Sequence, residues 1–311
     1  MLVLALAAIS ATAMISSQQV TVRRTENMIN NDQAYAFLLG AEQIGAWALG
    51  QDKNKTDHVS DWRCLIPDLC EEEQQQDVWL PVEGGVVGGH VEDMQGRFNL
   101  NNLIDGNAQP SAVDVARFRR LLRALGLEPD LALAVVDWLD ADQNASFPDG
   151  AEDTHYMTLQ APYRTHNGSM SSPSELLLVK GFDYKAYRAL ASHVCVLPSR
   201  TSINVNTATA AVIMSLADDV DAEEANTLVE DRDGKEGTAY ADVNEFLGLP
   251  LFSGRKGLSP EGLDVKSDHF LIASFAQIGR VGTHQFSVVQ RQGPAREIRV
   301  LYRTQGDRWE L

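Results

Sequence analysis

Acidic side chains crowd into one segment of the chain, residues 137–153. Residues 124–163 contain eight Asp or Glu side chains and no Lys or Arg. Carboxylates this close together repel one another, and a bound cation would offset that repulsion. Asp140, Asp142 and Asn144 alternate with other residues, which is the spacing of oxygen ligands in a calcium loop. The segment is therefore either a calcium site or a solvated acidic turn.

The spacing differs from that of an EF-hand. An EF-hand requires Gly at its sixth position and Glu at its twelfth. Counted from Asp140, these positions hold Ala145 and Ala151, and Glu152 comes one residue late. A calcium ion would need a different loop, closed by Glu152 and Asp153.

A second acidic cluster, residues 218–224, lies between two predicted helices, and we interpret it as a solvated turn. The wider segment 203–246 resembles a helix-hairpin-helix unit. Its turn, residues 217–221, has acidic residues where phosphate binding needs glycines and basic residues. The chain has 26 basic and 43 acidic residues, a net charge of −17, which disfavours contact with nucleic-acid backbones. We expect no nucleic-acid partner and a protein-packing role for this unit.

Common catalytic motifs are absent from the sequence: G-x-S-x-G, H-E-x-x-H, the P-loop and G-x-G-x-x-G. The seven histidines have no paired spacing. His155, near Asp153, is a candidate base, but a lone His beside an acidic loop is more often an outer-shell or surface residue. We expect that the protein is not an enzyme.

The first predicted structural element is a long helix at the N-terminal end of the chain. Residues 1–22 carry no charge, and no proline interrupts residues 1–50, so we expect one helix there. Its first fifteen residues would span about 22 Å, less than a bilayer core of about 30 Å. We expect 1–22 to be a truncated transmembrane part and 23–50 to be periplasmic. The alternative is a cleaved signal peptide, although no basic residues open the segment.

After that helix the pattern changes from strands to helices and back to strands. Residues 78–100 and three runs, 269–278, 284–292 and 298–304, are strand-like. The block between them has a helical pattern, with predicted helix starts at Ser111, at Ser172 with Glu175, and at Asp221. This order predicts an α+β fold with an inserted helical domain. We assign residues 51–104 and 265–311 to the α+β domain and residues 105–264 to the insertion.

An apolar-Asn-apolar-Asn pattern occurs at Phe98–Asn101 and again at Ile203–Asn206, each time before two helices. We expect each Asn to tether the helix that follows it through bonds to backbone.

Cysteines are few, three in the chain. Cys64 and Cys70 are separated by five residues, which allows a local disulfide in an oxidising compartment; two free thiols are the alternative. Cys195 lies in an apolar run, and we expect a buried thiol rather than a nucleophile.

Five short motifs together resemble one known family, the minor pseudopilin K proteins (general secretion pathway protein K) of type II secretion. The motifs are Arg23-Arg24-Thr25-x-Asn27, Asp93-x-x-Gly96-Arg97-Phe98-Asn99-Leu100-Asn101, Asp137-Trp138-Leu139-Asp140-x-Asp142, Gly150-Ala151-Glu152-Asp153-x-x-Tyr156 and Ile203-Asn204-Val205-Asn206-Thr207-Ala208. The order of helix, strands, helical block and strands also matches this family, over nearly the whole chain.

The resemblance implies a pilin-like fold, a long helix with an antiparallel sheet, whose helical insertion contains helix-hairpin-helix-like units. It implies a non-enzymatic role at the tip of a short periplasmic pseudopilus, capping the fibre. Implied partners are minor pseudopilins I and J, the major pseudopilin fibre, and the outer-membrane secretin or exoprotein cargo. The implied location is the bacterial inner membrane, with a single span and most of the chain in the periplasm. Family members bind calcium in the helical domain, and on that basis the expected ligands are Asp137, Asp140, Asp142, Asn144, Glu152 and Asp153.

The family begins with a basic leader and a peptidase site, so we expect Met1 to lie partway into the helix. Two other functions remain open. One is a periplasmic module that binds cargo directly, and the other is a helix-hairpin-helix nucleic-acid binder, which the acidity of the chain disfavours.

Overall fold

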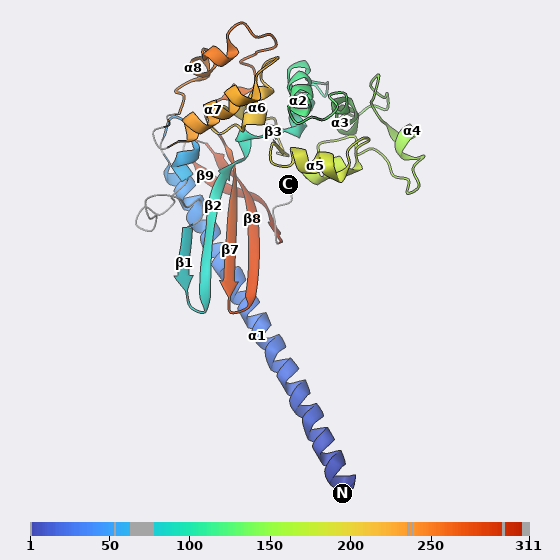
Figure 1. The fold of residues 1–311 in the computed structure, drawn as a ribbon, viewed down its shortest axis with the longest axis vertical. Coiled ribbons are helices and arrows are strands. Elements are labelled where there is room, and N and C mark those ends of the chain that lie inside the picture. The colour runs from blue at the N-terminus through green and yellow to red at the C-terminus, as the bar shows by residue number, and fades with distance from the viewer. Residues whose placement is uncertain are drawn as a thin grey trace.

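The computed structural model of the protein describes residues 2–52, 54–62, 78–234, 237, 239–293 and 296–306. Figure 1 shows a long N-terminal helix, an antiparallel sheet against its second half, and a helical head at the end away from the N-terminus. The predicted α+β fold is therefore confirmed. Cys64 and Cys70 lie outside the described residues. Cys195 is a buried free thiol, and burial raises its pKa to about 12.

Helix α1, Leu2–Gln51, runs without interruption for 50 residues, as the lack of proline predicts. Large apolar side chains before the helix reaches the sheet are exposed, among them Leu2, Ile15 and Ile29. Burial begins at Ala34, where the helix reaches the sheet. Among the described residues, no helix has an apolar stretch long enough to cross a membrane.

Five antiparallel strands form the main sheet, in the order β1-β2-β7-β8-β9. Their bounds are Val78–Val82, Gly85–Asp93, His269–Ile278, Val281–Gln292 and Glu297–Gln305. The three predicted C-terminal runs correspond to β7, β8 and β9. Strand β8 begins three residues before the predicted position because a tight turn at Gly279, with φ of +55°, starts the β7–β8 pairing at Val281.

One face of the sheet packs against the second half of α1. Leu38 and Leu49 of the helix are buried in two apolar clusters with residues of β2, β7 and β8. Between them, Glu42 is fully buried and forms a two-pronged ion pair with Arg303 of β9, at 2.6 and 2.7 Å. The Ser287 hydroxyl donates to the same carboxylate at 2.5 Å. A paired charge in an apolar interface is costly to separate, so Glu42 fixes where the helix sits along the sheet.

The head is inserted between β2 and β7 (Figure 1). Its α-helices are α2 (Ala112–Ala124), α3 (Leu131–Leu139), α4 (Asp153–Tyr156), α5 (Tyr184–Leu190), α6 (Ala210–Met214), α7 (Ala222–Asp233) and α8 (Val243–Leu247). The head also contains two short pairs of parallel strands. Strand β3 (Phe98–Asn99) pairs with β4 (Val194–Cys195), and β5 (Ile203–Asn204) pairs with β6 (Leu263–Asp264).

Helix caps in the head lie at the residues where the sequence predicts them. The Ser111 side chain caps α2, and Asp221 caps α7. Ser172 and Glu175 form a complete capping box, but the helix behind it is a short 3₁₀ helix, Pro173–Leu178, because the backbone is already extended at Val179. Caps are local interactions, so they can be predicted without the fold.

A single large apolar core holds the head together. Phe98, Leu100 and Leu103 are fully buried in it, although they precede residue 105, where we placed the start of the insertion. The Phe98 ring stacks on Phe118 of α2 at 5.4 Å between centroids. The segment that leaves the sheet is therefore part of the head from Phe98 onward.

Asparagines of the repeated pattern have equivalent roles. Asn99 accepts the backbone N–H of Asn101, and Asn204 accepts that of Asn206, at 3.2 and 3.0 Å. Their amide groups then donate to distant segments, as Asn204 does to the carbonyl of Asp57 at 3.0 Å. The asparagines thus tie together chain segments that lie 100 to 147 residues apart, as well as the turns that follow them.

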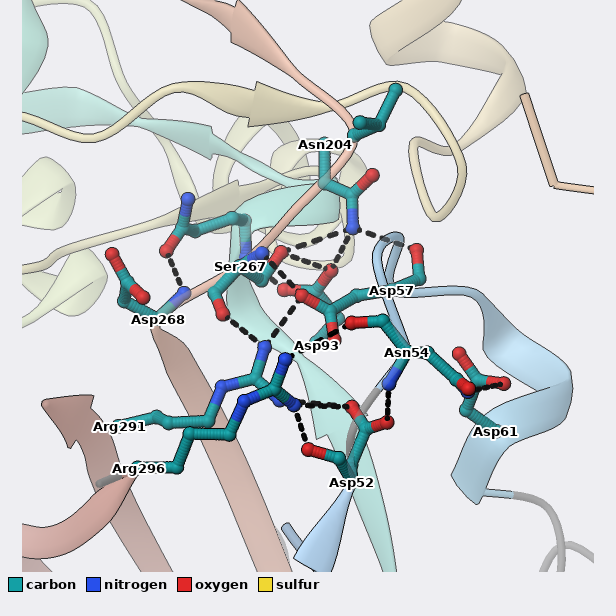
Figure 2. A network of polar contacts seen from close by, with 12 residues as sticks. Asp52, Asn54, Asp57, Asp61, Asp93, Asn204, Ser267, Asp268, Arg291 and Arg296 are labelled. Atoms are coloured by element: carbon teal, nitrogen blue, oxygen red, sulfur yellow. Dashed lines mark hydrogen bonds and ion pairs between the residues drawn. The ribbon is translucent and has the colours of Figure 1, made fainter. Parts of the chain in front are cut away.

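A buried polar network joins the head to the sheet (Figure 2). Arg291 of β8 donates to Asp52 at 2.9 Å and to Asp57 at 2.5 Å. Asp93, the last residue of β2, accepts a hydrogen bond of 2.6 Å from the Ser267 hydroxyl. The chain enters the head after Asp93 and leaves it near Ser267, so this network fixes both connections at one place.

Candidate metal centre

The acidic segment forms a loop between α3 and α4. Asp137, in the last turn of α3, is fully buried, and both of its oxygens accept the backbone N–H of Ser146, at 3.0 and 3.2 Å. Gly150 donates to the Ser146 carbonyl at 2.7 Å. A Cβ at Gly150 would lie 2.1 Å from Asp137 Oδ2, so the loop closes this tightly only with glycine at that position.

Three carboxylates converge in this loop. Asp140 follows α3, Asp142 lies two residues further on, and Glu152 precedes α4; one oxygen of each lies within 4.8 Å of the others. Asp142 is exposed, whereas Glu152 is only 1% exposed. In the part of the chain that the structure describes, no other trio of acidic, His or Cys side chains comes this close.

Electrostatic repulsion in the cluster appears in its pKa values. Burial, followed by repulsion from Asp137 and Asp140, raises the pKa of Glu152 to about 7. Burial, followed by repulsion from Asp142 and Asp137, raises the pKa of Asp140 to about 6. A divalent cation would reverse both shifts, because it favours the ionised carboxylates.

Both carboxylate oxygens of Glu152 are buried and accept no hydrogen bond from the described residues. The Thr165 hydroxyl is close enough to lower the Glu152 pKa slightly, but it donates to Asp153. A buried carboxylate without hydrogen bonds is costly unless a metal binds it. Three carboxylates form a hard oxygen set, which suits calcium or magnesium better than zinc. The residues present therefore fit a divalent cation.

Other residues predicted as ligands have protein partners. Asp153 Oδ1 accepts from the backbone N–H and the hydroxyl of Thr165, both at 3.0 Å, and Oδ2 pairs with Arg164 at 3.3 Å. Asn144 is exposed, and its backbone N–H donates to Asp142 at 2.7 Å. Asp137 borders the cluster and closes the loop as described above. The structure thus brings Asp140, Asp142 and Glu152 together and holds the other three residues beside them.

Asn167 was not predicted as a residue of this loop. Its amide donates to the Asp142 carbonyl at 3.3 Å, while its own side-chain oxygen is buried without a partner among the described residues. Asn167 has a positive φ of 49°, a conformation that Asn tolerates better than most residues. It lies 25 residues after Asp142 and outside any motif, so only the fold places it at this loop.

The second acidic cluster does not form a comparable site within the described residues. Asp218 pairs with Arg120 at 2.7 Å, and Glu224 pairs with Arg255 at 2.6 Å. Asp221 accepts backbone N–H groups at the start of α7. These carboxylates serve as ion-pair partners and a helix cap.

Comparison with known proteins identifies the family. Residues 96–199 and 203–266 match two sequence models, each described as Type II secretion system (T2SS), protein K. A Type II secretion system protein K of Pectobacterium carotovorum subsp. carotovorum is 32% identical over 324 residues, which cover 98% of this chain and 94% of that protein. The chain belongs to the type II secretion system protein K family. A protein K of Pseudomonas aeruginosa is 31% identical over 322 residues, covering 98% of this chain and 90% of the relative.

The protein K fold also has a solved counterpart. A crystal structure of the GspK-GspI-GspJ complex from the enterotoxigenic Escherichia coli Type 2 Secretion System contains a chain that matches with a TM-score of 0.72. The match covers 92% of this chain and all of the other, at 24% identity. It shows that the two chains share a fold. Asp140, Asp142 and Glu152 all lie inside residues 96–199, so the carboxylate cluster belongs to the region that matches the protein K family.

Proposed function

We propose that the chain is a minor pseudopilin at the tip of the type II secretion pseudopilus, with a structural role in protein export. Membership of the protein K family supports a place in this secretion system. The shape of the molecule, and above all the position of the head, supports the tip position.

The head lies beyond the end of the sheet, opposite the N-terminus (Figure 1). In a fibre whose subunits pack their N-terminal helices in parallel, the next subunit toward the tip would be added above the sheet. The head would occupy that space. A subunit of this shape therefore suits the end of a fibre and would stop further addition.

Helix α1 offers a surface for the partners of such a fibre. Met28, Ile29, Tyr35 and Trp47 are large apolar side chains that remain exposed on it, and exposed apolar surface of this kind is typical of contact sites. The matching fold occurs in a complex of GspK with GspI and GspJ, which supports minor pseudopilins I and J as partners here. We place the exposed apolar start of α1 in the inner membrane and the rest of the chain in the periplasm.

Immunogold labelling of overproduced pseudopili that contain the full chain tests the tip position. We expect label at one end of each fibre, co-purification of the chain with minor pseudopilins I and J, and loss of secretion when the chain is deleted. Label distributed along the fibre would contradict the proposal, as would normal secretion without the chain.

We also propose that Asp140, Asp142 and Glu152 bind one calcium ion, which makes the loop between α3 and α4 rigid. The convergence of three carboxylates and the unpartnered Glu152 oxygens support this assignment. Calcium titration by calorimetry should show one site that Asp142→Asn removes. Asp149→Asn is the matched control, because Asp149 is an exposed carboxylate in the same loop outside the cluster. An equal loss of calcium binding in both variants would mean that binding depends only on the overall charge of the loop.

A further inference from the structure

A largely apolar groove runs along α7 in the head. Leu228 of α7, Tyr240 and the segment Leu249–Leu251 line it, and its volume is about 510 Å³. Leu251 is buried, while Leu228, Tyr240 and Leu249 are half-buried, so apolar surface remains in contact with solvent. Concave apolar surface of this kind is a feature of binding sites.

Carboxylates border this groove. Asp221, Glu223, Glu224 and Asp231 all contribute to its lining. Glu224 has a basic partner, Arg255, at 2.6 Å. Glu223 and Asp231 make no ion pair with any residue that the structure describes, and both are exposed.

The basic residue of α7 does not neutralise this border. Arg232 is buried and donates to the carbonyls of Val205 and Ala208, both at 2.9 Å. Its guanidinium also pairs with the neighbouring Asp233 at 2.7 Å. The groove therefore combines an apolar floor with a border of negative charge.

We infer that this groove binds a cationic amphipathic segment of a partner protein. An apolar side chain of that segment would lie on the floor between Leu228 and Leu249, and Lys or Arg side chains would pair with Glu223 and Asp231. Tyr240, a half-buried residue of the groove lining, would offer its ring to one of these cations. Charge complementarity selects this class of ligand, because an anionic segment would meet carboxylates and a neutral one would leave them unpaired.

A metal ion is a poorer occupant. The carboxylates around the groove do not converge on one point. Among the described residues, only Asp140, Asp142 and Glu152 form such a group. The groove is also built from the head alone, without residues of α1. The inference therefore goes beyond the tip position and does not depend on it.

Fluorescence anisotropy with a labelled peptide, Lys-Leu-Arg-Leu-Lys, and the purified full chain tests the inference. Two matched peptides separate the contributions, one with Gly in place of Leu and one with Glu in place of Lys and Arg. We expect affinity at least tenfold weaker for the Gly peptide and no binding of the Glu peptide. Failure of the Lys-Leu-Arg-Leu-Lys peptide to bind, or equal binding of the Gly peptide, would overturn the inference.

Paired variants locate the site and control for the net charge of the protein. Glu223→Gln with Asp231→Asn removes two charges at the groove, and we expect at least a tenfold loss of affinity. Glu230→Gln with Asp219→Asn removes two exposed charges outside it and should leave affinity within twofold. These are surface substitutions, so both proteins should fold, which circular dichroism can check. Equal loss in the two double variants would show attraction by bulk charge alone and would overturn the assignment of the groove.

Discussion

Glu152→Gln should have opposite effects on stability with and without calcium. In the metal-free protein, the Glu152 carboxylate is buried near three other carboxylates and accepts no hydrogen bond from the described residues. Glutamine keeps the shape of the side chain, removes the charge and provides N–H donors for the neighbouring carboxylates. In the presence of calcium, the same substitution removes a ligand.

The magnitude follows from the pKa. Burial and repulsion raise the pKa of Glu152 from 4.5 to about 7. At about 1.4 kcal/mol per pKa unit, ionised Glu152 destabilises the metal-free fold by roughly 3 kcal/mol above pH 7. Allowing about 1 kcal/mol for the buried amide, Glu152→Gln should stabilise the metal-free protein by about 2 kcal/mol. Calcium at a thousandfold its Kd should stabilise the wild type by about 4 kcal/mol and the variant hardly at all.

Urea unfolding at pH 8, in chelator and in saturating calcium, measures both quantities. The variant should be the more stable protein in chelator and the less stable one in calcium. Asp149→Asn is the control, since it removes one exposed charge from the same loop and should change either value by less than about 0.5 kcal/mol. The argument from repulsion and metal binding fails if Glu152→Gln is less stable than the wild type in chelator, or if calcium stabilises the variant as much as the wild type.

Three further predictions concern the loop and the junction with the sheet. The folded, metal-free protein keeps a proton on Glu152 up to about pH 7, while the unfolded chain releases it near pH 4.5. The free energy of unfolding in chelator should therefore fall as pH rises between these values. A higher free energy of unfolding in urea at pH 8 than at pH 5 would contradict this. Gly150→Ala would place a Cβ 2.1 Å from Asp137 Oδ2 and should weaken calcium binding at least tenfold, and calorimetry showing wild-type affinity would disprove the close contact. Arg291→Ala leaves Asp57 buried without its cation and should destabilise the protein by about 3–5 kcal/mol in urea, whereas a loss below 1 kcal/mol would show that the ion pair is dispensable.

The sequence was sufficient to predict features that depend on near neighbours. Helix α1, the caps at Ser111 and Asp221, and the pairing of Asp140 with Asp142 all reflect residues a few positions apart. It could not decide between Glu152 and Asp153, because consecutive residues at the start of α4 point in different directions. The fold turns Glu152 into the cluster and Asp153 toward Thr165.

Features that depend on distant contacts were out of reach of the sequence. In the junction network, Arg291 meets Asp57, which is 234 residues earlier in the chain, and Ser267 meets Asp93 across 174 residues. No local pattern distinguishes these polar residues from solvated ones. Asn167 and the groove beside α7 were missed for the same reason, because each exists only once separate segments have packed together.

The place at which the head joins the sheet has a topological consequence. Apart from the head, strands that follow one another in the chain are also neighbours in the sheet, and all of them are antiparallel. Asp93, where the chain enters the head, pairs directly with Phe270, just after it returns. The head is thus one very long hairpin loop in a five-stranded meander. Because the entropy of closing a loop grows only slowly with its length, a head of different size or shape could occupy this position without altering the strand order. What the subunit contacts at its far end can therefore change while the sheet and α1 remain as they are.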